Sequence, residues 1–252
     1  MKKKLLIIFI ILFSFAIFAV VAEKNKENTK NKVHNIPQIV NEKKLKNEVD
    51  DDSEKTGGIF SGEFAGESAG CVDKPVIYLY PTKPTNVSVK LDFDGILSCT
   101  YPKYNDGWTV EAMPDGTLYD AKGMQYDYLF WEGKTKNKFD FSTGYCIKGE
   151  DTETFLETKL EELGLNRHEA NDFITYWLPK MEGNKYNIIS FQTKAYTDHA
   201  KLNISPNPDT MIRVFMAYKA SDTFEEMKEE KIDITPARSG FTVVEWGGTE
   251  CK

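Results

Sequence analysis

The sequence predicts an α+β fold: a predominantly antiparallel β sandwich or barrel-like sheet with an inserted helical hairpin. Three observations lead to this prediction. Short apolar or alternating segments recur over residues 74–131 and again after residue 186. Glycine, proline and aspartate separate them at short spacing, as in antiparallel sheets. Between the two groups, the apolar period changes from that of a strand to that of a helix.

The first predicted strands lie at the N-terminal end of the domain. Residues 74–81 (KPVIYLYP) are an apolar, β-branched and aromatic run between prolines, which predicts a strand. Residues 86–93 alternate apolar with polar, so one face is expected to be buried and the other solvated. Asp94-Gly95 is a usual hairpin dipeptide and predicts that this strand pairs with residues 96–101.

The strand pattern continues on both sides of the helical region. Before that region come a strand at residues 108–113, a turn at 114–117 (PDGT) and a strand at 126–131. After it, strands are predicted at residues 186–192, 211–218, 232–235 and 241–246.

Two helices with a very short connection are predicted between these groups. The first starts at residues 151–152, and Gly164 is placed to end it. Asn166, with Glu169 three residues later, forms a capping-box-like start for the second helix, and Pro179 is expected to stop it. Their apolar faces carry Phe155, Leu156, Leu160 and Leu163 in the first helix, and Phe173, Ile174 and Trp177 in the second.

Residues 1–22 are typical of an export segment. Three lysines precede an apolar run at residues 5–22, which is the layout of a secretory signal that would be cut before Glu23. The run is also long enough for a membrane span, so a cleaved signal peptide and an N-terminal membrane anchor both remain open. In either case the lysines predict that the rest of the chain is extracytoplasmic, secreted or anchored to the cell membrane.

Residues 23–70 predict a flexible tether, because they are rich in charged and small polar residues and nearly lack aromatic ones. Residues 71–252 are then a single folded domain. The formal net charge of the chain is −7, which argues against a nucleic-acid partner because phosphate binding needs a basic surface. No motif predicts a cofactor.

All four cysteines lie in the domain, and an even number in an oxidising compartment predicts disulfides. The positions of Cys71 and Cys251 near the two ends of the domain favour one bridge between them and a second between Cys99 and Cys146. Zinc is the alternative, but no CxxC or histidine pair is present, so no metal site is predicted.

Two tryptophan-flanked glutamates are the catalytic candidates, each at the end of a predicted strand: Glu132 beside Trp131, and Glu245 beside Trp246. Two unlike carboxylates across a cleft are what glycoside hydrolysis uses, and the indoles suit stacking on sugar rings. The alternative is that both glutamates pair with lysine or arginine while the tryptophans fill the core.

Two of the three arginines are candidates for ligand binding. Arg213 lies in a strongly apolar strand, where a buried guanidinium needs a carboxylate partner; Glu132 and Glu245 are both candidates. Arg238 lies in a loop, where its guanidinium is suited to a carboxylate or phosphate of a ligand.

Four segments together resemble an uncharacterised family of exported microbial proteins, which includes proteins of Gram-positive anaerobes. They are KPVIYLYP at 74–81, YLFWEG at 128–133, DFITYWLP at 172–179 and GFTVVEWGG at 240–248. The similarity spans nearly all of residues 71–251 and implies one domain. No activity is established for that family, so the resemblance implies no reaction.

The leading functional hypothesis is a surface-displayed or secreted binding or structural module, with cell-wall glycan or an envelope protein as partner. It fits a tethered acidic domain that carries no catalytic signature. The alternative is a glycan-directed hydrolase that uses Glu132 and Glu245.

Overall fold

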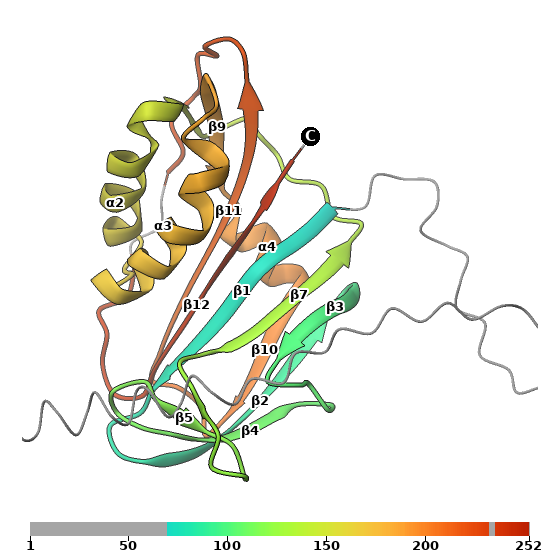
Figure 1. Ribbon diagram of the computed structural model, residues 1–252, viewed down its shortest axis with the longest axis vertical. Coiled ribbons are helices and arrows are strands. Elements are labelled where there is room, and N and C mark those ends of the chain that lie inside the picture. Colours follow the sequence, from blue (N-terminus) through green and yellow to red (C-terminus); the bar gives the residue numbers. More distant parts are fainter. Residues whose placement is uncertain (1–69, 232–234, 252) are drawn as a thin grey trace, which may run out of the picture. The chain divides into compact units, whose positions relative to one another are not determined.

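The computed structural model describes residues 70–231 and 235–251. These residues form two β-sheets and a helical layer (Figure 1). The predicted export segment, and the tether except for Gly70, lie outside the described residues.

The larger sheet has seven strands in the order β3-β7-β1-β12-β11-β9-β8. β11 and β12 run parallel, whereas every other neighbouring pair in this sheet is antiparallel. The strands are β1 (Gly70–Tyr80), β3 (Ile96–Tyr101), β7 (Leu129–Thr135), β8 (Tyr145–Lys148), β9 (Tyr186–Phe191), β11 (Thr210–Ser221) and β12 (Thr242–Glu250).

The smaller sheet has five antiparallel strands in the order β10-β2-β4-β5-β6. They are β2 (Thr85–Phe93), β4 (Trp108–Ala112), β5 (Leu118–Tyr119), β6 (Gln125–Tyr126) and β10 (Ala200–Ser205). This sheet packs against one face of the larger sheet.

The opposite face of the larger sheet is partly covered by α2 (Thr152–Glu162) and α3 (Arg167–Met181), which lie side by side in Figure 1. A 3₁₀ turn, η1 (Gly149–Asp151), leads into α2, and a short helix, α4 (Thr193–His199), connects β9 to β10. We call the two sides of the larger sheet its helix face and its inner face.

Strand alternation in β1 supplies both sides of the larger sheet. Val76 and Tyr78 are buried on the helix face, and Ile77 and Leu79 are buried on the inner face. Successive side chains of a strand point to opposite sides, so one run of apolar residues can serve two cores. This explains why residues 76–79 are apolar without interruption.

The helical hairpin forms where the sequence predicts it. Asn166 Oδ1 accepts a hydrogen bond from the Glu169 amide at 3.0 Å, and Glu169 Oε2 accepts one from the Asn166 amide at 2.8 Å, which completes the capping box. Gly164, at φ +85°, ends the first helix in a left-handed conformation that favours glycine. α3 continues through Pro179 to Met181, so the prediction that Pro179 stops this helix is wrong.

The predicted hairpin between residues 86–93 and 96–101 is also wrong, although both strands exist. β2 belongs to the smaller sheet and β3 to the larger one. At the turn, the Asp94 amide still donates to the His199 carbonyl at 2.8 Å, which extends the pairing of β2 with β10, and β3 then pairs with β7 of the larger sheet. A turn dipeptide marks where a chain bends, and the pairing of the next strand is decided by the packing of the two sheets.

Other differences are local. The strand predicted at 126–131 is split between β6 and β7, and the sequence did not predict α4, β8 or β10. Residues 232–234 of a further predicted strand lie outside the described residues. The fold class is confirmed as an α+β, sheet-dominated fold in which antiparallel pairing prevails. In the described part of the chain, no helix is long and apolar enough to span a membrane.

Candidate functional site

Glu245 is the partner of Arg213. The two residues are cross-strand neighbours on the parallel pair β11 and β12. Glu245 Oε2 accepts a hydrogen bond from Arg213 Nε at 2.6 Å and lies 2.5 Å from Arg213 Nη2. The Glu245 side chain has no solvent exposure, and that of Arg213 is 9% exposed. This is a buried ion pair, as one of the two readings of the sequence expected.

Aromatic side chains enclose this pair on the inner face. Trp131 Nε1 donates to Glu245 Oε1 at 3.3 Å, and the Arg213 guanidinium lies 4.9 Å from the centre of the Tyr196 ring. Burial, followed by the Glu245 charge, raises the pKa of Tyr196 well above its usual value. The surroundings are a packed core, which gives Glu245 a structural role.

Glu132 lies on the other side of the sheet. Leu129 and Trp131 of β7 pack in the inner core, whereas Phe130 packs against the core under the helices. Alternation therefore places Glu132 on the helix face, away from Glu245. The sheet separates the two glutamates, and they do not face one another across a cleft.

The remaining two ligand-binding candidates also have partners within the fold. Trp246 is fully buried on the helix face, with its ring 5.2 Å from that of Phe173. Arg238 Nη1 donates to Glu169 Oε1 at 3.0 Å, and Arg238 Nη2 donates to the Gly164 carbonyl at 2.7 Å. Arg238 thus ties its loop to the helical hairpin.

Asp73 is the carboxylate that the structure places beside Glu132. Val72 of β1 pairs with Gly133 of β7, and the strands are antiparallel, so Asp73 and Glu132 are the next residues along the two strands. The register shifts just after Val72, so these two residues are not a ladder pair, but the Glu132 charge acts on Asp73, and two like charges close together are unfavourable. Two carboxylates held close together do not stabilise the fold, so their proximity indicates a binding or catalytic site.

Aromatic and lysine side chains from β1, from α3, and from β7 and the residue before it pack together on the same face as these two carboxylates. Lys74 Nζ donates to the Tyr128 hydroxyl at 3.2 Å and lies 4.9 Å from the centre of that ring and 5.0 Å from that of Phe130. Lys180 Nζ lies 4.1 Å from the centre of the Tyr176 ring. We call the following group the α3–β1 cluster: Asp73, Lys74, Tyr128, Phe130, Glu132, Tyr176, Lys180, Tyr218 and Glu250.

The β1 backbone is irregular at the centre of this cluster. The register between β1 and β7 shifts between Val72 and Val76, and Lys74 has φ +58°, a conformation uncommon for a residue with a side chain. Bulges and strained residues are frequent beside functional sites, where they redirect side chains. Here the irregular stretch contains both Asp73 and Lys74 of the cluster.

The electrostatic environment of the cluster favours a protonated Asp73. Burial, and then the Glu132 charge, raise the pKa of Asp73 to about 6, while Lys180 acts in the opposite direction. Burial, and then the charges of Asp73 and Glu132, raise the pKa of Tyr176 to about 12. Asp73 therefore changes charge close to neutral pH.

A buried hydroxyl interacts with the same cluster. Tyr218 of β11 is fully buried, and within the described structure no acceptor meets its hydroxyl with the geometry of a full hydrogen bond. Burial, then the charge of Glu250, an interaction of the hydroxyl with the Glu250 carboxylate and the charge of Asp73 raise the pKa of Tyr218. Beside it, Trp177 covers Gly248, where a Cβ atom would come within 2.7 Å of the indole. The glycine lets α3 approach the sheet and brings Tyr176 and Lys180 to the carboxylates.

Among the residues of the α3–β1 cluster, the sequence identified Glu132 as a candidate site residue and did not identify the others. A signal was present: adjacent residues in a strand point to opposite faces, so Trp131 does not flank Glu132 and Trp246 does not flank Glu245. Asp73 and the α3 residues carried no signal, because only the packing of α3 on the sheet brings them together.

The predicted bridge between Cys99 and Cys146 does not form. Both residues are described, and neither is bonded to another cysteine. Cys99 is on β3 and Cys146 on β8, which are the two edges of the seven-stranded sheet. Six strand spacings of about 4.8 Å separate these edges, whereas a disulfide needs Cα atoms within about 7 Å. The predicted Cys99–Cys146 pairing is therefore wrong.

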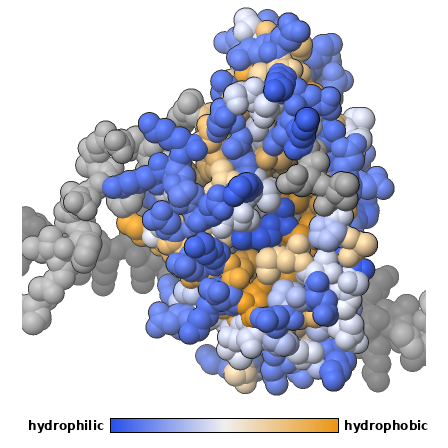
Figure 2. Space-filling view, turned by 180° about the vertical axis from the view of Figure 1, so that it is seen from behind, coloured by the Kyte–Doolittle hydropathy of each residue, from blue (hydrophilic) through white to orange (hydrophobic). Residues whose placement is uncertain are grey.

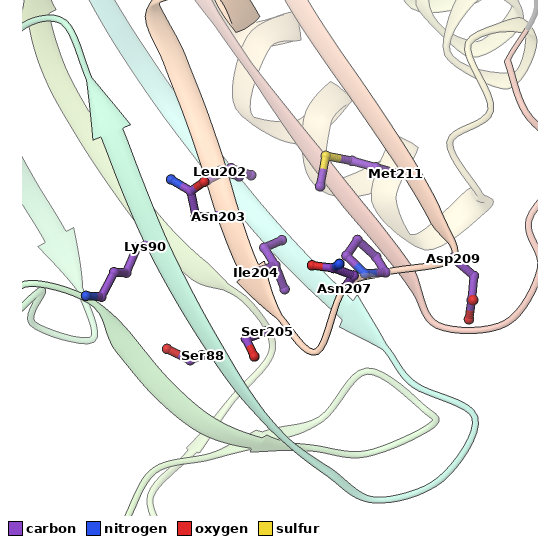
Figure 3. A pocket seen from close by; sticks show the side chains of 10 residues that line it. Ser88, Lys90, Leu202, Asn203, Ile204, Ser205, Asn207, Asp209 and Met211 are labelled. Carbon is purple, nitrogen blue, oxygen red and sulfur yellow. The ribbon is translucent and has the colours of Figure 1, made fainter.

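A separate pocket of about 740 Å³ lies beside the edge strand β10 (Figure 3). Ser88 and Lys90 of β2 line it together with Asn203 and Ser205 of β10, and no aromatic side chain does. Seen from behind, the molecule is mostly hydrophilic, with an apolar area in its lower half (Figure 2). The pocket combines neither aromatic rings nor paired carboxylates, so the α3–β1 cluster is the stronger candidate site.

Comparison with known proteins identifies one informative relative. An uncharacterised protein in the bglA 3′ region of Butyrivibrio fibrisolvens is 49% identical over 89 residues, which are 30% of this chain and 92% of the relative. No family model and no solved structure matches the chain significantly. The identity and the coverage of the relative show that this chain belongs to the same family as the uncharacterised Butyrivibrio protein.

Proposed function

We propose that the domain is an extracytoplasmic binding module that holds cell-envelope glycan in the α3–β1 cluster. The observation that carries the proposal is the combination of Tyr128, Phe130 and Tyr176 with two neighbouring carboxylates, Asp73 and Glu132, at partly exposed positions of the helix face. Neither group alone distinguishes a sugar site from an ordinary surface.

The chemistry of a sugar matches both parts of this combination. Aromatic side chains offer large rigid contact areas, on which the C–H faces of a sugar ring can pack. Carboxylates accept hydrogen bonds from sugar hydroxyls, and bonds to a charged acceptor are stronger than those between neutral groups. A short run of sugar units would lie beside α3, over β1 and β7.

The extracytoplasmic location is inferred from the sequence of residues 1–70, nearly all of which lie outside the described structure. A basic apolar export segment followed by a polar tether would present the domain outside the membrane, where envelope glycan is available. Cleavage and anchoring are equally compatible with binding.

The hydrolase hypothesis that paired Glu132 with Glu245 gains no support from the structure. Glu245 is fully buried against Arg213, and Glu132 lies on the opposite face of the sheet. A glycosidase needs both carboxyl groups on the same scissile bond.

Isothermal titration with soluble cell-wall oligosaccharides tests the proposal. We use the hexamers of N-acetylglucosamine and of glucosamine as probes, and Tyr176→Ala as the site variant. Tyr101→Ala is the matched control, because Tyr101 is 62% exposed on β3 and lies outside the cluster. We expect saturable binding that Tyr176→Ala weakens about tenfold and Tyr101→Ala leaves unchanged. Absence of binding to both hexamers, or equal affinities of wild type and Tyr176→Ala, would refute the proposed function.

A further inference from the structure

The aromatic rings of the α3–β1 cluster already hold ammonium groups. Lys74 Nζ lies about equally far from the centres of the Tyr128 and Phe130 rings, at 4.9 and 5.0 Å, and 5.8 Å from that of Tyr176. Lys180 Nζ lies 4.1 Å from the Tyr176 centre. A cation within about 6 Å of a ring centroid is attracted by the negative face of the ring. The rings therefore form a site for ammonium groups, which the chain fills with its own lysines.

Carboxylates outnumber the lysines in the same place. The charges of Glu132, Glu250 and Lys180 all act on Asp73, and within the described residues none of the three carboxylates lies within 4.0 Å of a lysine or arginine nitrogen. The cluster thus has acceptors for a further cation. Carboxylates that have no cation in contact attract one from solution most strongly at low ionic strength.

The buried Tyr218 hydroxyl is an independent sign that the cluster is incomplete. It makes no hydrogen bond of full geometry, although it interacts with the Glu250 carboxylate, and the charges of Glu250, Asp73 and Tyr176 act on it. Buried polar groups normally have partners, and an exception asks for an explanation. A carboxylate that is drawn inward or reoriented by a bound cation would supply an acceptor.

The two lysines are not equally replaceable. Lys74 is partly buried and donates to the Tyr128 hydroxyl. Lys180 is exposed on the last turn of α3, and among the described residues it makes no hydrogen bond through its ammonium group. Moving the flexible Lys180 side chain away from the Tyr176 ring would free that ring face at little cost.

We infer that the site prefers an amino sugar that carries a free ammonium group over its N-acetylated form, and that the ligand ammonium takes the place of Lys180 on the Tyr176 ring. The inference rests on the proposed function and narrows its ligand class. It predicts that a substitution which removes the positive charge of Lys180 strengthens the binding of the sugar, whereas the loss of a binding-site residue normally weakens it.

Titrations of the glucosamine hexamer and the N-acetylglucosamine hexamer into the full chain, at low salt and a pH just above 6, test this inference. We expect the wild type to bind the glucosamine hexamer about tenfold more tightly than the N-acetylated hexamer. Glu132→Gln should abolish that preference. Lys180→Met, which keeps the apolar stem, should strengthen glucosamine binding about threefold. Lys83→Met is the matched control, because Lys83 is exposed in the loop after β1.

The outcomes separate the inference from the proposed function. Equal or tighter binding of the N-acetylated hexamer overturns the inference and leaves glycan binding in place. Weaker glucosamine binding by Lys180→Met also overturns it, because Lys180 would then contact the ligand directly. Binding of neither hexamer overturns both. A near-native circular dichroism spectrum and melting temperature establish that each variant is folded.

Discussion

Glu245 Oε2 lies 2.6 Å from Arg213 Nε inside the inner core, where Glu245 has no exposure to solvent. The pair joins the two parallel strands of an otherwise antiparallel sheet. Removing one charge of a buried pair leaves the other without a partner, which is much more costly than removing both. This property makes the role of the pair measurable.

We predict that Arg213→Met lowers the free energy of unfolding by about 3–5 kcal/mol, because it leaves Glu245 buried and unpaired. The double variant Arg213→Met/Glu245→Met should regain most of that loss. Arg167→Met is the control, since the Arg167–Glu157 pair is exposed and should contribute less than about 1 kcal/mol. Urea unfolding of the wild type, of Arg213→Met, of Glu245→Met, of the double variant and of the control measures the coupling. Additive losses in the double variant would contradict the structural role of the pair.

Arg238 gives a second test of a buried carboxylate. Glu169 has no solvent exposure and accepts from both the Asn166 amide and Arg238. Arg238→Met should therefore destabilise the domain by about 2–3 kcal/mol, with Arg167→Met again as the exposed control. Amide hydrogen exchange in the Arg238→Met variant should become faster, and the largest increase should be in the connection between α2 and α3. Unchanged exchange there would show that Arg238 does not hold the hairpin.

Because the pKa of Asp73 is raised in the folded protein, we predict that the free energy of unfolding depends on pH. The pKa of Asp73 in the folded protein, about 6, is raised above the ordinary value of 3.8 by burial and by Glu132. The group therefore stabilises the fold at a pH below about 4, and this contribution is lost as the pH rises through 6. The groups whose charges act on Asp73, or on which it acts, are Glu132, Tyr176, Lys180, Tyr218, Glu250 and Cys251.

Asp73→Asn should consequently be more stable than the wild type at pH 7, by about 1–2 kcal/mol after allowance for solvent screening, and close to it at pH 4. Thermal unfolding of both proteins across this range checks the difference. Asp127→Asn, in the exposed loop before β7, should show no such trend. A difference between Asp73→Asn and the wild type that stays constant with pH would rule out titration of Asp73 as its source. Higher stability with weaker sugar binding would fit a site that is maintained for function.

Oxidation of the cysteines is limited by the sheet. Cys99 and Cys146 lie on opposite edges, so peptide mapping after mild oxidation of the folded protein should yield no peptide that links these two residues within one molecule. The unfolded protein, oxidised in the same way, is the control and should yield the linked peptide. Detection of that peptide from the folded monomer would contradict the strand order.

Much of the fold was predictable because local patterns carry it. Alternation located β2, the helical period located α2 and α3, and the Asn166–Glu169 capping box set the start of α3. The pairing of β2 was not predictable from its turn, because Asp94-Gly95 bends the chain in the same way whether the next strand joins the same sheet or another one. Edge strands such as β8 and β10 are short, and their weak patterns gave no signal.

The candidate site, like the fold, has some features that the sequence predicts and others that only the tertiary structure shows. Chemistry is local, so the sequence by itself determined that Arg213 needs a carboxylate. The prediction that Glu132 ends its strand is wrong, because β7 continues to Thr135. The choice of Glu245 for Arg213, and of Asp73 as the neighbour of Glu132, depended on strand order and register. Only the tertiary structure decided these, because contacts between residues far apart in the chain follow from the packing of whole elements, which no short segment encodes.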